Sequence, residues 1–453
     1  MSGLVSGRAL MEESAVATVF EREENAYTLA VQAGLWGYPL GHRVEVWNKT
    51  LEVKGVGRNA LRRFERLKTA DDRFIVTPNN LTIDAYALID TTHGPVVLFV
   101  PQLESPRWSI MQVDDAFDDV TANLGGIKGP MPGAYVVTGP NHTGRIPAGL
   151  TRIPLRTVCG EAAVRIQVNG EADLPAAVHE LRGFRVMPLR DYLDYGLALD
   201  AENYDPLPFA DLSAPTELEM FDRLGAAMQY LLPTSLDTED TFIQSLAAIG
   251  LSVGRGFAWQ DLDPSVRAGL VRAAPVVEQI TDERWQSMGT AVNGWRGSLS
   301  SGRCSYDFAL NAANTKNQIG TEIPEEVVYL NCRIDADGKP LDGANAYRIR
   351  FEAGATPPVT GMWNLALYGE DMLFTANDAH RFSIGTTTED LHSDLDGSLT
   401  LYIQNGRPEE PGQVANWLPA PHGPFNLTMR FYAPLAPVLD QSYRLPPVHR
   451  AHR

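Results

Sequence analysis

Four aspartates lie close together in the segment VDDAFDD, at Asp114, Asp115, Asp118 and Asp119. If this segment is helical, Asp114 lies over Asp118 and Asp115 over Asp119, because residues four apart share a helix face. Crowded carboxylates raise one another's pKa values or bind a hard cation, and a carboxyl with a raised pKa suits general acid–base catalysis. We therefore predict catalytic roles for Asp114 and Asp115. The alternative is a solvated acidic turn in which Arg107 pairs with one carboxylate.

A second set of candidates is aromatic and lies toward the C-terminus. Trp417 stands in the proline-rich segment NWLPAPHGPF, and Trp363, Tyr368 and Arg381 lie in the same region. Aromatic walls with an arginine suit a planar or carboxylated small molecule, so these four residues are predicted to bind substrate. His422 lies in the same loop, where catalytic residues often occur, and is predicted to be catalytic. The alternative is that these aromatic side chains only close the end of a hydrophobic core.

The sequence gives no sign of a metal or cofactor site. The three cysteines, Cys159, Cys304 and Cys332, form no Cys-x-x-Cys pair, and no His-x-x-x-His or His-Glu-x-x-His occurs among the nine histidines. The segment from Asp335 to Asp342 lacks the ligand spacing of a calcium loop and predicts a hairpin turn. There is no P-loop and no Gly-x-Ser-x-Gly motif. We expect a metal-independent fold and no cofactor.

Charge and hydropathy limit the partners. The 453 residues carry a formal net charge of −18, which repels phosphate backbones and anionic lipid, so neither nucleic acid nor a membrane is expected as a partner. The opening residues, MSGLVSGRALMEES, lack the apolar stretch of a signal peptide, and we expect a cytoplasmic protein that acts on a small molecule. Apolar residues in a weakly patterned stretch (Trp285, Met288 and Trp295) suggest a homo-oligomer, a dimer or a trimer.

The periodicity of apolar residues divides the chain into four parts. Residues 1–50 have helical spacing that Gly37 and Pro39 interrupt, and residues 201–310 are again helical, with Asp263 as a capping residue before Pro264. Residues 51–200 and 311–453 consist of short alternating segments separated by turn residues, such as AVRIQVNG and AYRIRFE. This pattern predicts a mainly β, α+β protein with two antiparallel β-sandwich or jelly-roll-like domains joined by a helical region.

An ordered series of motifs resembles a known bacterial family. The N-terminal part contains TPNNLTIDAYALID, GPVVLFVP, PRWSIMQVDDAFDD and GAYVVTGPNHTGRIPAG, and the C-terminal part contains DADGKPLDGANAYRIRF, PPVTGMWNLALY, RFSIG, DGSLTLYIQN and NWLPAPHGPFNLTMRFYAPL. These segments are similar to the two-domain family of domains of unknown function 1254 (N-terminal half) and 1214 (C-terminal half). The resemblance implies two antiparallel β-domains joined by helices, oligomers in some members, and no single agreed reaction.

Two details of the resemblance bear on a site. The acidic segment falls in a family-matching stretch just after Arg107 and Trp108, which we therefore add to the predicted substrate-binding residues. The family usually has Phe-Trp-Ser where this chain has Met362-Trp363-Asn364. If that position lines a site, a different ligand is expected here.

Two functions fit these observations. The first is a cofactor-independent enzyme that acts on a small organic molecule, a hydrolase or a lyase of hydratase type, with acid–base Asp, Tyr or His groups in a pocket between the domains. The second is a non-catalytic protein that binds a small molecule or forms an oligomeric assembly. A deep interdomain pocket with convergent Asp, Arg and Tyr side chains favours the first, and filled domains with a large apolar interface favour the second.

Overall fold

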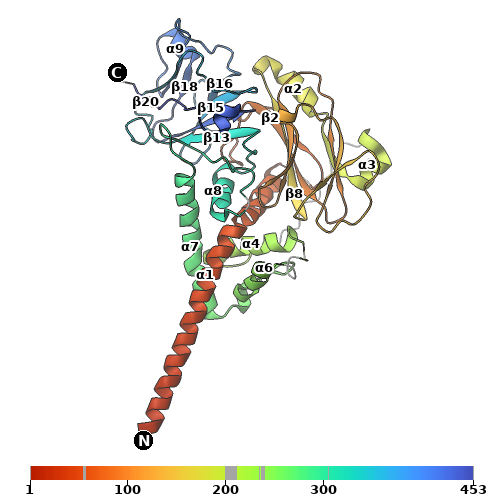
Figure 1. The fold of residues 1–453 in the computed structure, drawn as a ribbon, viewed down its shortest axis with the longest axis vertical. Helices are drawn as coiled ribbons and strands as arrows, with labels where there is room; N and C mark the ends of the chain where they lie inside the picture. Colours follow the sequence, from red (N-terminus) through yellow and green to blue (C-terminus); the bar gives the residue numbers. More distant parts are fainter. Residues whose placement is uncertain are drawn as a thin grey trace.

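The computed structural model describes residues 2–54, 58–198, 212–233, 235, 240–304 and 306–451, and within the first helix it describes the side chains of residues 18–47. It is a mixed α+β protein with several antiparallel sheets, as the sequence predicts. Two β-sandwiches lie side by side, and a group of helices packs beneath them (Figure 1). The expected boundary between the first β-domain and the helical region, at residue 200, lies outside the described residues.

The N-terminal sandwich has two sheets. The first has the strand order β1-β2-β8-β4-β5 and the second the order β7-β6-β3-β9. Their strands are β1 (Arg62–Phe64), β2 (Thr82–Asp90), β3 (Val96–Val100), β4 (Ser109–Asp115), β5 (Val120–Gly125), β6 (Gly133–Thr138), β7 (Thr151–Pro154), β8 (Cys159–Gln167) and β9 (Arg185–Pro188). Helices α2 (Leu174–Leu181) and α3 (Leu189–Tyr195) flank this sandwich. The core is formed by aliphatic side chains such as Ile83, Leu98 and Val164.

The C-terminal sandwich repeats this plan with the orders β12-β13-β19-β15-β16 and β18-β17-β14-β20. Its strands are β12 (Trp295–Arg296), β13 (Val327–Cys332), β14 (Tyr347–Phe351), β15 (Trp363–Tyr368), β16 (Ser383–Gly385), β17 (Leu399–Gln404), β18 (Trp417–Pro419), β19 (Asn426–Tyr432) and β20 (His449–Arg450). Short helices α9 (Pro411–Ala415) and α10 (Ala436–Leu439) lie in its loops. Pairing is antiparallel throughout both sandwiches except between β6 and β7 and between β17 and β18.

Helix α1 (Ser2–Lys54) continues through Pro39, so the predicted interruption at Gly37 and Pro39 is wrong. A proline inside a helix costs about 3 kcal/mol, and tertiary packing offsets this cost. A Cβ added at Gly37 would lie 2.3 Å from a methyl of Leu224. Glycine therefore lets the neighbouring helix approach α1 closely. The residues that look like helix breakers in the sequence are contact points in the fold.

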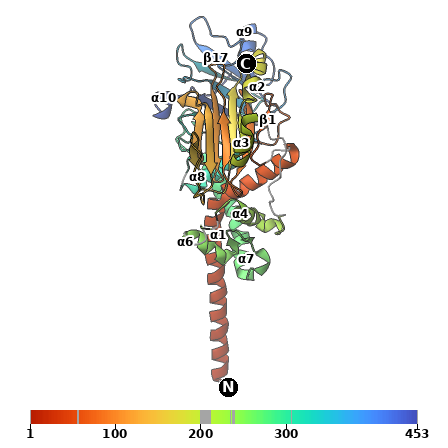
Figure 2. The same cartoon turned by 90° about the vertical axis from the view of Figure 1, so that its right-hand side faces the viewer.

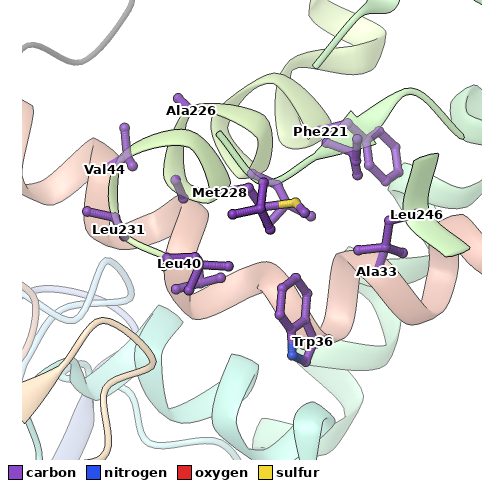
Figure 3. Packing of buried hydrophobic residues seen from close by; sticks show 14 of the residues in the cluster. Ala33, Trp36, Leu40, Val44, Phe221, Ala226, Met228, Leu231 and Leu246 are labelled. Carbon is purple, nitrogen blue, oxygen red and sulfur yellow. The ribbon is translucent and has the colours of Figure 1, made fainter. Parts of the chain in front are cut away.

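The helical group packs against α1. It contains α4 (Glu219–Tyr230), α6 (Thr241–Ser245), α7 (Pro264–Ser287) and α8 (Phe308–Gln318), with a small hairpin of β10 (Leu251–Ser252) and β11 (Gly256–Phe257). Figure 3 shows Trp36 and Leu40 of α1 directed toward Met228 of α4. The predicted cap is confirmed, because the Asp263 side chain accepts a hydrogen bond from the Ser265 N–H at the start of α7.

The apolar residues that suggested an oligomer are buried within the chain. Trp285 and Met288 pack with Leu310 beneath the sandwiches, and Trp295 belongs to the C-terminal core. They therefore provide no surface for a second copy, and that part of the argument for assembly is wrong. The N-terminal end of α1 extends away from the body of the molecule (Figure 2), and Phe20 on it is 64% exposed.

Candidate functional site between the two sandwiches

The two sandwiches meet through the outer faces of their larger sheets. On β19, Leu427, Met429 and Phe431 point into the C-terminal core. Arg430 and Tyr432 alternate with them and therefore point the other way, toward the N-terminal sandwich. An apolar cluster at this junction joins Leu81, Trp108 and Ile110 of the N-terminal part to Val327, Met362 and Tyr432 of the C-terminal part.

A cavity of about 60 Å³ lies beside this cluster. Its titratable side chains come from three places along the chain. They are Lys68, Asp84, Tyr86 and Arg165 of the N-terminal part, Glu322 after α8, and Tyr329, Arg430 and Tyr432 of the C-terminal sandwich. Three of these groups are cations and two are carboxylates, so the cavity carries one excess positive charge when all five are ionised. It is an interdomain pocket in which Asp, Arg and Tyr side chains converge.

Arg430 is the cation without an anionic partner. Its side chain is 3% exposed, and one guanidinium nitrogen, Nη2, donates to the Thr77 carbonyl at 2.8 Å. The other, Nη1, has no hydrogen-bond partner, and within the described ranges no ion pair involves Arg430. The guanidinium carbon lies 5.9 Å and 5.8 Å from the ring centres of Tyr329 and Tyr368. Aromatic faces attract a cation but do not neutralise its charge.

Arg165 is fully partnered in comparison. Its Nη1 donates to the Glu322 carboxylate at 2.8 Å and to the Gln112 side chain, and its Nη2 donates to the Gly320 carbonyl at 2.8 Å. Asn123 donates a further hydrogen bond to Glu322 at 3.1 Å. Burial nevertheless raises the pKa of Glu322 to about 7, against the lowering effect of Arg165. Glu322 therefore exchanges a proton near neutral pH.

Asp84 organises the other wall of the cavity. It accepts hydrogen bonds from Lys68, from the Tyr86 hydroxyl at 3.0 Å and from Thr82 at 2.7 Å. Burial and the neighbouring Asp84 raise the pKa of Tyr86 well above its ordinary value. Burial also raises the pKa of Tyr329 to about 12. These tyrosines remain protonated, and their hydroxyls can donate as well as accept hydrogen bonds. The Tyr329 hydroxyl accepts one from the Glu322 N–H at 3.3 Å.

Asn364 adds two further unsatisfied polar atoms beside Arg430. It lies directly opposite Arg430 in the register of β15 and β19 and so shares its face of the sheet. The residue is fully buried, and neither its amide oxygen nor its amide nitrogen has a hydrogen-bond partner in the described structure. Buried polar groups are almost always partnered. This concentration of unpaired groups makes the junction a candidate site for a polar ligand or water.

The predicted acidic cluster is not helical. Asp114 and Asp115 end strand β4, and Asp118 follows in a turn with a φ of 65°. The alternative of a solvated turn is wrong as well, because Asp114, Asp115 and Asp118 are all buried. Arg107 pairs with Asp173 at 2.7 Å and with Glu180 at 3.0 Å, and not with this cluster.

The aspartates instead divide into two ion networks. Asp114 and Asp118 surround Arg43 together with Glu161, whose Oε2 lies 2.9 Å from Arg43 Nη1. Asp115 pairs with Arg156, which also bonds Asp119 at 2.6 Å. Among the described residues no group of three or more His, Cys, Asp or Glu side chains is arranged to hold a metal ion.

The aromatic residues predicted to bind substrate do not all lie at one site either. Tyr368 lies under Arg430 and donates to the Pro78 carbonyl at 2.8 Å, whereas Trp363 points into the C-terminal core and packs against Phe351. The reason is the alternation of β15, which places these two residues on opposite faces. Trp108 packs edge-on against Tyr432, with ring centres 5.1 Å apart, and thus supports the wall of the interdomain cavity.

Arg381, Trp417 and His422 lie together, but elsewhere. They line a surface groove of about 760 Å³ at the edge of the C-terminal sandwich. Arg381 Nη1 donates to the carbonyls of Val414, Ala415 and Trp417, so its hydrogen bonds hold the chain that leads into β18. Trp417 is buried, and its indole N–H donates to the Gln404 carbonyl at 2.8 Å.

Sequence reasoning missed most of the interdomain cavity, above all Arg430, Glu322 and Arg165. In a strand with one buried face, an alternating charged residue is expected to face solvent. One signal was present in TIDAYALID, where Asp84 interrupts a run of otherwise apolar or small residues. The structure shows eight of the nine residues of this strand as buried, which means that both of its faces are covered.

In the described part of the chain, no helix is both long enough and apolar enough to cross a membrane. None of the curated proteins matches the sequence. Among solved structures, the VPA0106 protein from Vibrio parahaemolyticus is 20% identical, covers 94% of this chain and 100% of its own, and superposes with a TM-score of 0.67. An uncharacterised protein from Burkholderia cenocepacia is 13% identical over 98% of each chain, with a TM-score of 0.44. These likenesses concern the fold alone.

Two family models match most of the regions that form the cavity, although Glu322 lies outside both matches. Residues 58–188 match the protein family of unknown function DUF1254, and residues 326–436 match the protein family of unknown function DUF1214. The first match includes Lys68, Asp84 and Arg165, and the second includes Tyr329 and Arg430. The chain belongs to the two-domain family that combines an N-terminal DUF1254 domain with a C-terminal DUF1214 domain.

Proposed function

We propose that the protein is an enzyme that acts on a small organic anion in the cavity between the two sandwiches, without a redox cofactor. The observation that carries the proposal is Arg430, which is buried and has no carboxylate partner. Within this proposal, a lyase of hydratase type is favoured over a hydrolase. The cavity offers proton donors and a proton acceptor, and the three cysteines are all buried.

The charge of Arg430 is the physical reason for an anionic substrate. A guanidinium does not lose its proton in proteins, so a buried one needs a negative partner. The Thr77 carbonyl and the tyrosine rings supply only partial negative charge. A substrate carboxylate would complete the pair through Nη1, and such charge-assisted hydrogen bonds are about twice as strong as neutral ones.

Glu322 is the proposed acid–base group. General acid–base catalysis is most efficient when the pKa of the group lies near the working pH, and burial raises the pKa of Glu322 to about 7. Tyr329, which stays protonated, would donate its hydroxyl hydrogen to an oxygen of the substrate, whereas the Tyr86 hydroxyl already donates to Asp84. Addition or removal of water requires one group that takes a proton and another that gives one, and these residues supply both.

Two variants test the binding role. Arg430→Met should abolish binding of small carboxylates such as acetate or propanoate, as measured by isothermal titration calorimetry. Arg381→Met is the matched control, since Arg381 is a half-buried arginine of the C-terminal sandwich whose guanidinium donates to main-chain carbonyls outside this cavity. Equal carboxylate affinities in both variants and the parent protein would refute the proposal.

The catalytic role needs a separate measurement. Glu322→Gln keeps the size of the side chain but removes its titration. Proton NMR in D₂O with a panel of hydroxy and unsaturated acids should show deuterium incorporation or turnover with the parent protein and not with this variant. Carboxylate binding by the variant should persist. If the parent protein and the Glu322→Gln variant both bind carboxylates, and the parent protein exchanges no proton of any compound in the panel, the protein binds its ligand without catalysis.

One observation favours the second candidate, an assembly protein. Helix α1 projects beyond the body of the molecule, and Val19 and Phe20 on it are 51% and 64% exposed (Figure 1). Apolar residues on a projecting helix suit self-association into a dimer or a trimer. Light scattering of the full chain and of a Phe20→Glu variant tests this, and a monomer mass for the parent protein at every concentration excludes it.

A further inference from the structure

We infer that the substrate carries a compact hydrocarbon body attached to its anionic group, and that this body occupies a second cavity directly beside the first. This inference rests on the proposed function of the Arg430 cavity. The second cavity measures about 50 Å³ and shares five wall residues with the first: Ile75, Tyr86, Arg165, Ile319 and Gly320. The two cavities therefore lie side by side, as two lobes with five wall residues in common.

The walls of the second lobe are mostly apolar. Val46 and Trp47 come from α1, Phe74 from the segment before β2, and Leu88 from β2 itself. The Phe74 ring stacks on Phe64 with centres 5.5 Å apart, which holds it in place as a wall. Burying a hydrocarbon group between such side chains is favourable by about 25 cal/mol for each Å² removed from water.

The charged groups at the edge of this lobe are occupied by one another. Arg43 pairs with Glu161 at 2.9 Å and with Asp118, and the Trp47 indole N–H donates to Glu161 at 2.9 Å. The contrast with the first lobe is clear, because there Arg430 has no anionic partner. A ligand is thus oriented with its anionic end at Arg430 and its apolar end between Trp47 and Phe74.

The volumes set the size of the ligand. The lobes measure about 60 Å³ and about 50 Å³ on the scale on which one water needs about 10–15 Å³. Together they hold on the order of ten non-hydrogen atoms. Three of these belong to a carboxylate group, which leaves roughly five to seven carbons. The inferred substrate class is therefore a monocarboxylic acid with a short alkyl or single-ring body.

Calorimetry with acetate, butanoate, hexanoate and phenylacetate tests the inference on the full-length protein. Affinity should rise along the alkyl series by about fourfold per methylene, and hexan-1-ol, which lacks the anionic group, should bind far more weakly than hexanoate. Val46→Trp fills the second lobe and should remove this gain while acetate still binds. Phe74→Ala, which enlarges the lobe, should move the preference toward longer acids.

The outcomes separate this inference from the proposal beneath it. If acetate and hexanoate bind equally well and Arg430→Met abolishes both, the anion site stands and the second lobe is wrong. If Arg430→Met leaves acetate binding unchanged, the proposed function itself fails. A rising affinity that neither Val46→Trp nor Phe74→Ala alters would place the hydrocarbon body elsewhere and would also overturn the inference.

Discussion

Two buried arginines, Arg43 and Arg430, lie in neighbouring parts of the molecule and have opposite surroundings. Arg43 is encircled by the carboxylates of Asp114, Asp118 and Glu161, so negative charge is in excess around it. Arg430 has a carbonyl and aromatic rings around it and no carboxylate. The unpartnered atoms are the Asp114 Oδ2 oxygen and the Arg43 Nε nitrogen around the first arginine, and the Nη1 nitrogen of Arg430 itself at the second.

The sign of the excess charge decides what each region can do. A carboxyl can accept a proton, and burial raises the pKa of Asp114 well above its ordinary value despite the lowering effect of Arg43. The Arg43 cluster is thus neutralised from within and suits a structural role. An arginine cannot be neutralised in this way. An anion from outside would balance the charge of Arg430, which makes its cavity the better candidate for a binding site.

The largest effect is expected from Arg43→Met. This variant leaves the buried Asp118 and the partly buried Glu161 without their counter-charge, and removing one partner of a buried ion pair costs about 3–5 kcal/mol. Urea denaturation measures the loss. Arg272→Met is the control, since Arg272 pairs with Glu23 and Glu24 at the surface, and its denaturation midpoint should hardly move. If Arg43→Met unfolds at the same urea concentration as the parent protein, the Arg43 cluster does not have the structural role proposed for it.

Arg430→Met should behave in the opposite way. Because no carboxylate is left behind, the free energy of unfolding should stay within about 1 kcal/mol of the parent value or rise. The same denaturation experiment, run in a buffer free of carboxylates and phosphate, decides the point. A loss of unfolding free energy as large as that of Arg43→Met would mean that both arginines have a structural role. The proposed difference between them would then be wrong.

The next effect concerns pH. The folded pKa of Glu322, about 7, lies above its ordinary value of 4.5, so the folded state binds more protons between these two values. The contribution of this group to stability is complete below about pH 4.5 and is lost as the pH rises through 7. Glu322→Gln should remove this decline in the free energy of unfolding. The decline amounts to roughly 1.4 kcal/mol for each unit by which folding raises the pKa.

The same titration predicts how anion binding changes with pH. Protonation of Glu322 removes a negative charge from the cavity, so acetate should bind more tightly at pH 6 than at pH 8. Glu322→Gln should bind acetate with the same affinity at both. Unchanged acetate affinity across this range in the parent protein would show that Glu322 does not act on the anion site.

The smallest effect is expected at Asn364. Both of its polar side-chain atoms are buried and unpartnered, which costs free energy in the absence of a ligand. Asn364→Leu has a similar shape and should raise the stability of the free protein by about 1 kcal/mol. Differential scanning calorimetry measures the shift, with Asn416→Leu as a control, because Asn416 is buried but donates to two carbonyls. Destabilisation by Asn364→Leu would contradict the prediction.

The sequence by itself determined the family, the mixed α+β class and many strands of both sandwiches. These features depend on patterns within short segments: AYRIRFE alternates apolar and polar residues, and its strand β14 alternates between buried and exposed positions. The cap at Asp263 is equally local, because the carboxylate and the N–H that it accepts lie two residues apart. Local pattern and local structure agree wherever one face of an element meets solvent.

Only the tertiary structure decided where the site lies. Arg430 alternates with core residues in the same manner as the exposed Arg348 of β14, and only the docking of the second sandwich buries it. Thr77 and Arg430, or Arg165 and Glu322, are brought together from distant parts of the chain. The helical interpretation of Asp114 to Asp119 failed for the same reason. Local spacing permits a helix there, whereas pairing with β8 makes Asp114 and Asp115 the end of a strand, and a turn that buries Asp118 beside Arg43 follows.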